Sequence, residues 1–361
     1  MSKVIKLKKG LDIKLNGAAD KVVQTLGNPS HCALKPTDFR VLVPRLAVKV
    51  GDEVKAGDVL FIDKARPEIK FTSPVSGTIE EIKRGERRKL LEVVVKADTE
   101  TRYHDFGKVE INKLKREEII NRMLEGGVWP MVKQRPYDII ANPTTTPKAI
   151  LVSGFDSAPL APDYEFILNG QEHDLQTGFD CLSKLCNKNV NLNLEAGTPS
   201  ASVFTKLKNV EINYFSGPHP CGNVGIQINH LNPINKGELV WVVNIQDVAI
   251  IGRLFNEGRF DARKIIAVAG SEVNKPLYYH TVLGVSIANI LDGKLKKQVD
   301  ERIISGNVLT GTQVEANGYL GYYDNLITVI PEGNHYEFLG WAAPGFNKFS
   351  ASKLFPSFLC P

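Results

Sequence analysis

Apolar and polar positions alternate in short runs between residues 40 and 97, and this pattern predicts an all-β module. The strand-forming runs are RVLVPRLAVKV, EVKAGDVLFID, IKFTSPVSGTIEEI and KLLEVVVKA. Gly-Asp pairs at 51–52 and 57–58 and the step from Pro74 to Gly77 supply turns between these β-branched runs. We therefore expect a β module over residues 40–100, preceded by an N-terminal segment, residues 1–39, that packs on the domains after it.

From about residue 112 the spacing of apolar positions becomes helical. Leu114, Ile119, Ile120 and Met123 are spaced as on one helix face and precede a glycine stop. Further on, the strand-like runs AILVSGF, VNLNLE, NVEINYF and ELVWVVN alternate with the helical runs TGFDCLSKLCNK and QDVAIIGRLFNEG. This alternation predicts an α/β domain over residues 101–260, with a mainly parallel sheet and crossover helices.

The last part of the chain predicts a smaller, mixed domain. After RKIIAVAG come short strands around RIISGNVLTGTQV and LITVIPEG, separated by HTVLGVSIANILDG, which we expect to be helical. These elements indicate an α+β domain over residues 261–335, and residues 336–361 begin a further C-terminal region. Because the chain stops at the apolar sequence KLFPSFLCP, we expect that a longer protein has been cut here.

Length and charge narrow the class of protein. A chain of 361 residues exceeds one ordinary core and suggests several domains. Lys plus Arg number 45 against 40 for Asp plus Glu. We expect this small positive excess to be spread along the chain without a dense basic block, so nucleic acid is not indicated as a partner. The start MSKVIKLKKGLDIKL lacks the apolar core of a secretory signal. No apolar run reaches the roughly 18 residues of a spanning helix. We expect a cytoplasmic protein with only peripheral membrane contact.

The β module resembles biotinyl and lipoyl carrier domains over KVGDEVKAGDVLFIDKARPEIKFTSPVSGTI. In those carriers the modified lysine sits at a hairpin tip, eight residues before the proline that matches Pro74, and Arg66 holds this position here. Arginine stays charged and cannot be acylated by the ligase. Lys64 lies off the tip. We therefore expect a carrier fold that is used for packing or docking.

Gly126 and Gly127 follow a predicted helix, and their position allows two interpretations. A phosphate-cradling loop needs glycines that open a helix, whereas these two close one, which favours a helix C-cap. Neither a GxGxxG nor a Walker sequence occurs in the chain, so independent dinucleotide binding lacks its usual support.

The segment WPMVKQRPYD combines aromatic faces with a guanidinium group. Trp129, Pro136 and Tyr137 could receive a quinone ring, and Arg135 could donate a hydrogen bond to its carbonyl. The alternative is core packing with an arginine at the surface. These four residues are the candidate quinone contacts.

A second candidate segment, SGPHPCGNVG at 216–225, follows a predicted strand. Ligand sites in parallel sheets gather at the carboxyl ends of strands, so His219 and Cys221 are candidates for a pocket wall, with a structural turn as the alternative. A metal held by His219, Cys221 and His230 matches no common zinc spacing. We expect no metal, no iron-sulfur cluster and no catalytic residue in this chain.

In chain order, the segments KKGLDIKL, GGVWPMVKQRPYD, FSGPHPCG, NIQDVAIIGRLF, AGSEVNKP, RIISGNVLTGT and GWAAPGFNKFS resemble the A subunit of the sodium-translocating NADH:quinone oxidoreductase. The resemblance runs essentially end to end. It implies a barrel-sandwich hybrid module, a Rossmann-like α/β domain and a β-grasp domain of the soluble-ligand-binding type. The family continues into a C-terminal helical segment with further cysteines, which this sequence lacks.

The resemblance also implies a role. It is that of a peripheral subunit on the cytoplasmic side of the inner membrane, in a complex that couples NADH oxidation and reduction of ubiquinone or menaquinone to sodium export. The expected partners are other subunits, especially a membrane-embedded one, and quinone; the chain itself binds no cofactor and is inactive in isolation. His219 would then be a polar part of the quinone pocket wall.

Relatives of the same layout bind flavin and nucleotide through a GGAGFP-like loop. They are the flavin-binding subunit of respiratory complex I and the C subunit of the Rnf complex. Here GGVWP departs from that loop, because Val128 and Trp129 crowd a backbone that must approach phosphate. The alternative function is that of an electron-input subunit that binds NADH and flavin.

Overall fold

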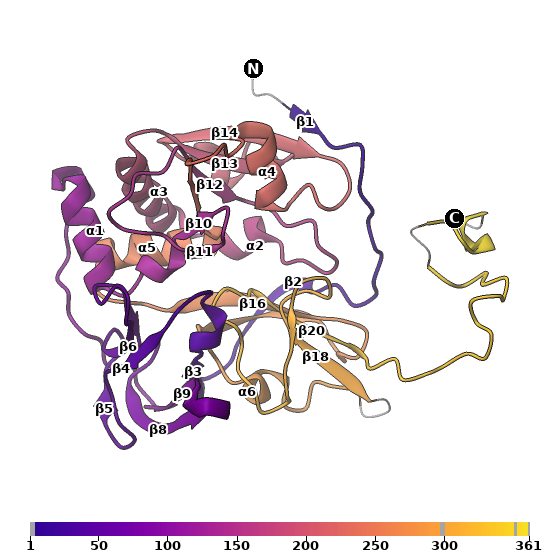
Figure 1. Ribbon diagram of the computed structural model, residues 1–361, viewed down its shortest axis with the longest axis horizontal. Coiled ribbons are helices and arrows are strands. Elements are labelled where there is room, and N and C mark those ends of the chain that lie inside the picture. The colour runs from indigo at the N-terminus through magenta and orange to yellow at the C-terminus, as the bar shows by residue number, and fades with distance from the viewer. Residues whose placement is uncertain (1–3, 297–299, 350–351, 360–361) are drawn as a thin grey trace.

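A computed structural model describes residues 4–296, 300–349 and 352–359, and the described chain forms four β-sheets. The largest is a seven-stranded sheet with α-helices on both faces, at the upper end of the molecule in Figure 1. Its strands, in spatial order, are β1 (Val4–Lys6), β14 (Val210–Ser216), β13 (Val190–Glu195), β12 (Ile150–Ser153), β15 (Val240–Val242), β10 (Lys133–Arg135) and β11 (Ile139–Ile140).

The first five of these strands are parallel, as the alternation of strand and helix patterns predicts. Successive side chains of a strand point to opposite faces, so Ile150 and Val152 join the large core beneath α3 (Glu172–Cys186) and α5 (Ile245–Glu257). Leu151 packs on the other face against Ile228 of α4 (Val224–Leu231). Two further helices, α1 (Arg116–Glu125) and α2 (Tyr164–Leu168), complete this domain.

Small residues let α3 and α5 pack closely. A Cβ on Gly252 of α5 would lie 1.9 Å from the carbonyl oxygen of Asp174, and one on Gly178 of α3 would lie 2.1 Å from that of Val248. Glycine therefore allows the two backbones to approach within the distance that a side chain would occupy.

The second sheet is mixed and six-stranded. One of its faces packs on a separate hydrophobic core. Its strands in order are β19 (Thr312–Gln313), β18 (Glu301–Ser305), β20 (Leu326–Pro331), β16 (Arg263–Ala269), β17 (Leu277–Val282) and β2 (Asp20–Thr25). The expected helix over HTVLGVSIANILDG is largely wrong: β17 extends through Val282, and α6 covers only Ile287–Leu291. Pairing of β17 with β16 and β2 overrides the local helical spacing.

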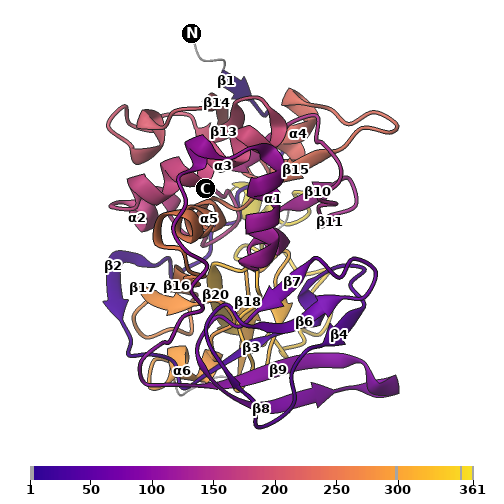
Figure 2. The same ribbon diagram turned by 90° about the vertical axis from the view of Figure 1, so that its left-hand side faces the viewer.

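The predicted β module is present as two small sheets, at the lower end of the molecule in Figures 1 and 2. One contains β3 (His31–Leu34), β9 (Leu90–Ala97), β8 (Gly77–Arg84) and β5 (Glu53–Val54). The other contains β4 (Pro44–Leu46), β6 (Val59–Asp63) and β7 (Lys70–Thr72).

The hairpin tip that carries Arg66 does not project freely. The Arg66 side chain is only 28% exposed and lies between the Asp63 carboxylate, 3.4 Å from its Nε, and the Ile140 carbonyl of the α/β domain, 3.4 Å from Nη1. The tip of the carrier-like module thus packs on the neighbouring domain.

The N-terminal segment contributes strands to three of the four sheets. Strand β1 pairs with β14, β2 pairs with β17, and β3 pairs with β9, so each belongs to a different domain. At the other end, residues after β20 lead away from the body of the molecule (Figure 1). Their large apolar side chains, including Tyr336, Phe338 and Trp341, are exposed. In the described residues no helix has the length and apolarity needed to span a membrane.

Candidate functional site

A cleft opens where the parallel sheet reverses its strand order. From β12 the chain builds outward to β13 and β14 on one side and returns to β15 on the other, so the connections after β12 and β15 diverge. In open α/β sheets ligands bind at such a position, beside the carboxyl ends of the strands. The cleft has a volume of about 330 Å³ and is lined there by Ser153, Phe155 and Asp156 after β12 and by Val242, Val243 and Asn244 at the end of β15.

Aromatic and apolar groups from several segments close the cleft. Met131 precedes β10, Tyr164 comes from α2, and Tyr323 comes from the mixed-sheet domain, with Asn307 and Thr310 beside it. The residues 222–224 at the start of α4 form a further side. The lining thus combines apolar and aromatic side chains with a comparable number of polar and charged ones.

Arg135 and Lys133, on β10, place two cations in the cleft wall. Their shared counter-ion is Asp138, whose carboxylate lies 2.7 Å from Lys133 Nζ and 3.2 Å from Arg135 Nη2. Arg40 Nε is 3.7 Å from the same carboxylate. Burial lowers the pKa of Lys133, with Asp138 opposing the effect.

One nitrogen of Arg135 has no partner. Its Nε is buried and makes no hydrogen bond in the described part of the chain, although Nη2 reaches Asp138. A buried guanidinium N–H without an acceptor is costly, so this nitrogen adds strain to the site. Of the predicted quinone contacts, Arg135 is the one that lines this cleft.

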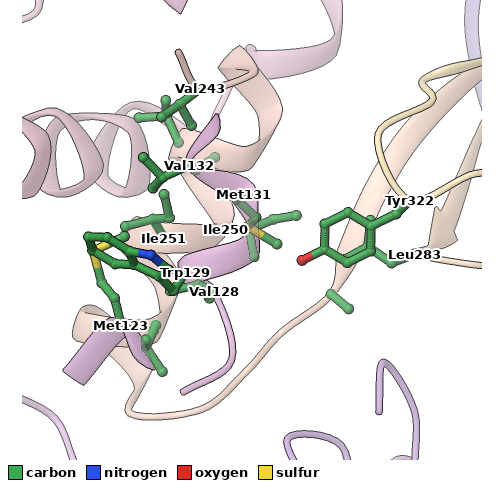
Figure 3. Packing of buried hydrophobic residues seen from close by; sticks show 14 of the residues in the cluster. Met123, Val128, Trp129, Met131, Val132, Val243, Ile250, Ile251, Leu283 and Tyr322 are labelled. Atoms are coloured by element: carbon green, nitrogen blue, oxygen red, sulfur yellow. The ribbon is translucent and has the colours of Figure 1, made fainter. Parts of the chain in front are cut away.

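Trp129 lies elsewhere. It is fully buried, its Nε1 donates a hydrogen bond to the Ala141 carbonyl at 2.8 Å, and its ring meets that of Trp241 edge-on with centroids 5.6 Å apart. Figure 3 shows the indole enclosed by neighbours that include Met123 and Val132. Since no face of this ring is free in the structure, core packing describes Trp129, and a ring-stacking role does not.

Pro136 and Tyr137 form the turn between β10 and β11, outside the cleft. The Arg135–Pro136 peptide is cis, Pro136 is exposed, and the Tyr137 ring is 72% exposed. These four candidate residues are therefore not gathered at one point: Arg135 lines the cleft, Trp129 is in the core, and Pro136 and Tyr137 lie at the surface.

His219 stands behind one wall of the cleft. Its Nδ1 lies 3.0 Å from the Ser157 hydroxyl, and its backbone N–H donates to the Asp12 carboxylate at 2.8 Å. Ser157 also accepts the Gly222 N–H at 2.8 Å, which joins the loops after β12 and β14. His219 thus positions the loop that carries Asp156 and does not itself line the cleft. Burial raises the pKa of Asp156, although the nearby His219 opposes this effect.

A buried acid in α5, three residues after the cleft residue Asn244, was not predicted from the sequence. Asp247, in the first turn of α5, is 1% exposed, and neither carboxylate oxygen has a hydrogen-bond partner in the described residues. Burial raises its pKa to about 6, although Lys264 and Lys133 act in the opposite direction. Its position in a first helical turn resembles an ordinary dipole-stabilising acid, so local sequence gave no signal of burial.

The glycines at the end of α1 are a C-cap, as predicted. Gly126 caps the helix, and Gly127 follows with φ +71°. A Cβ on Gly127 would lie 2.1 Å from Thr72 Oγ1 of the β module, and one on Gly126 would meet Leu254 at 2.5 Å. These glycines let three elements pack together and open no helix. Among the described residues, no group of three or more His, Cys, Asp and Glu side chains is arranged to hold a metal ion.

The fold and the cleft define a class: a multidomain protein with a barrel-sandwich module, an α/β domain with a cleft at the reversal of strand order, and a smaller mixed α/β domain. Three family models match it along its length: the NqrA N-terminal barrel-sandwich hybrid domain at residues 5–98, the NqrA second alpha/beta domain at 114–260, and the NQRA C-terminal domain at 265–316. The chain belongs to the NqrA family, whose members are the A subunits of the Na(+)-translocating NADH-quinone reductase.

Several proteins named as this A subunit share substantial sequence identity with the chain. The A subunit from Yersinia pseudotuberculosis serotype O:1b (strain IP 31758) is 38% identical over 355 residues, which cover 97% of this chain and 78% of the relative. That from Hahella chejuensis (strain KCTC 2396) is 36% identical over 365 residues, covering 99% and 80%. The barrel-sandwich hybrid and the α/β domain that the resemblance implies are confirmed.

Solved structures give a weaker likeness. An NAD+-reducing [NiFe]-hydrogenase in the air-oxidized state aligns with a TM-score of 0.43 and 12% identity, over 65% of this chain and 53% of that one. A likeness at this level carries no argument about function.

Proposed function

We propose that the chain is a peripheral subunit, on the cytoplasmic side of the inner membrane, of a complex that couples NADH oxidation and quinone reduction to sodium export. Family membership over almost the whole chain supports this role. We further propose that the cleft at the strand reversal receives the quinone ring. The observation that carries this proposal is that the Arg135 side chain lines a cleft together with Phe155, Tyr164 and Tyr323.

The chemistry of the cleft suits a quinone. A quinone is a flat ring with two carbonyl acceptors, so it needs aromatic or apolar walls and at least one donor. The aromatic side chains supply the walls, and the guanidinium of Arg135 supplies a charged donor, which forms stronger hydrogen bonds than a neutral one. Ubiquinone and menaquinone share this chemistry, and either is the substrate of the whole complex in this proposal.

The same proposal gives this chain no flavin, nucleotide or metal of its own. Gly126 and Gly127 are occupied with packing against Leu254 and Thr72, which leaves neither of them free to cradle a phosphate. The isolated chain is therefore expected to oxidise no NADH, and electrons and sodium ions pass through partner subunits, including a membrane-embedded one.

We also propose finer assignments for two domains. The α/β domain, with five parallel strands and helices on both faces, is of the Rossmann-like kind. The mixed sheet with α6 is a β-grasp domain of the soluble-ligand-binding type.

Calorimetric titration of the purified chain with a short-chain quinone, NADH and flavin mononucleotide tests the function. The proposal expects quinone to bind and the other two to give no heat. Binding of NADH or flavin without quinone would instead support the electron-input alternative.

A further inference from the structure

The turn between β8 and β9 concentrates positive charge at one end of the molecule. Residues 83–89, KRGERRK, contain five cations and one carboxylate, so the expectation of no dense basic block is wrong at this place. The strands belong to the β module, at the end of the molecule opposite the seven-stranded sheet in Figures 1 and 2. Apart from Gly85, every residue of this turn is exposed.

Most of these cations are not neutralised by the protein. Lys83 lies 3.6 Å from Glu92 at the base of the hairpin. Within the described residues, Arg84, Arg87, Arg88 and Lys89 have no carboxylate within ion-pair distance; Arg84 Nη1 donates to the Arg88 carbonyl at 3.0 Å. The turn therefore presents four unpaired positive charges over a short distance.

Arg87 and Arg88 occupy the two central positions of the hairpin turn, where the charge is densest. Arg87 and Arg88 have φ values of +53° and +60°, a left-handed conformation that glycine and asparagine adopt more readily than arginine. Two consecutive arginines are held there although both side chains are exposed. Left-handed values at both central residues are those of the common two-residue hairpin turn, which holds the two arginines at the tip of the β8–β9 hairpin.

We propose that this basic turn, residues 83–89, docks on the anionic headgroups of a phospholipid surface. None of the exposed large apolar side chains in the described residues lies between 81 and 92, so the turn offers no apolar core for a specific protein interface. A convex tip with long cationic side chains instead fits a flat polyanionic surface, to which each basic residue adds affinity. This inference rests on the proposed function, which places the chain beside a membrane.

Sedimentation of the full chain with lipid vesicles tests the proposal. The vesicles contain no quinone and are made either of phosphatidylcholine or of an equimolar mixture with phosphatidylglycerol. The double variant Arg87→Asn/Arg88→Asn removes two charges and suits the left-handed backbone, so the fold is retained. The matched control, Lys8→Asn/Lys9→Asn, makes the same charge change at exposed residues near β1, at the opposite end of the molecule.

The chain is expected to bind the anionic vesicles, and added salt should weaken this binding. The hairpin variant should bind at least about tenfold more weakly, since each cation near an anionic surface contributes about fivefold. The control should stay within about twofold of the unmodified chain. Equal loss in both variants, undiminished binding by the hairpin variant, or equal binding to neutral vesicles would each overturn the proposal. Quinone titration of the same hairpin variant is expected to be unchanged, so failure of the lipid proposal and failure of quinone binding are separable.

Discussion

The ammonium group of Lys133 lies 2.7 Å from the carboxylate of Asp138, and Lys133 forms part of the wall of the cleft. The same ammonium lies 4.5 Å from the centroid of the Tyr323 ring, which belongs to the mixed-sheet domain. Lys133 therefore joins two domains, and its ion-pair partner is an acid that it shares with Arg135 and Arg40.

Replacing Asp138 tests whether its ion pairs with Lys133 and Arg135 stabilise the fold. Asp138→Asn leaves Lys133 and Arg135 without their counter-ion in a partly buried site, and we expect the free energy of unfolding to fall by about 1–3 kcal/mol. Glu110→Gln is the matched control, because its pair with Lys113 is mostly exposed and should change stability by less than about 0.5 kcal/mol. Urea denaturation of both variants measures the difference. Equal effects would show that Asp138 is only a surface acid.

Trp129 gives the second prediction. Trp129→Phe keeps much of the buried ring but leaves the Ala141 carbonyl without its donor, so we expect a loss of about 1–3 kcal/mol in urea denaturation. Quinone affinity should change less than about twofold, because the indole does not line the cleft. Trp341→Phe, at a ring that is 77% exposed, is the control and should leave stability unchanged. A large loss of quinone affinity with unchanged stability would instead mean that Trp129 contacts the quinone.

Gly127, which follows α1, gives the third prediction. Gly127→Ala places a Cβ 2.1 Å from Thr72 Oγ1 at φ +71°, so steric overlap adds to backbone strain, and we expect a loss of at least about 2 kcal/mol. Gly51→Ala isolates the backbone contribution, because Gly51 has φ +90° but nothing within 4 Å of a Cβ, and it should cost about 1 kcal/mol. Thermal unfolding compares the two. Similar losses would mean that α1 and the β module are not in close contact at this point.

Asp247 predicts a particular dependence of stability on pH. Its pKa in the folded protein, about 6, exceeds its ordinary value of 3.8, so the folded state holds the proton more tightly than the unfolded state. Stability due to this group is present below pH 3.8 and is lost as the pH rises through 6. The difference between the two values corresponds to about 3 kcal/mol.

The variant Asp247→Asn lacks this titration. Its stability relative to the unmodified chain should therefore increase by up to about 3 kcal/mol between pH 4 and pH 8, measured by urea denaturation at each pH. The neighbouring cations Lys264 and Lys133, which act to lower the pKa of Asp247, are the same in both proteins. A difference that does not change with pH would mean that Asp247 is solvated in the folded protein.

Local sequence predicted the elements whose pattern is repeated over several turns or strands. Two patterns were sufficient to predict these elements, since each element buries a continuous face. They are the apolar spacing of α1, α3 and α5 and the β-branched runs of β12, β13 and β14. The N-terminal strands were not predicted as members of three separate sheets, because each is short and its partners lie far away in the sequence.

The candidate site was predicted only in part, for a similar reason. Arg135 could be found because a guanidinium beside aromatic residues is unusual locally. Trp129 was placed at a ligand because its sequence neighbours are the same whether the indole is exposed or enclosed by Trp241 and the bond to Ala141. The cleft itself depends on the return of the chain from β14 to β15, which no local pattern reveals.

The central claim is that quinone binds at the cleft through Arg135, and titration calorimetry with a short-chain quinone tests it most directly. Arg135→Gln should weaken binding by about tenfold or more, because a hydrogen bond from a charged donor is lost. Arg84→Gln, an equal change at an exposed arginine at the other end of the molecule, should leave the affinity unchanged. Equal affinities for the unmodified chain and the Arg135 variant, or no binding of quinone at all, would contradict the account.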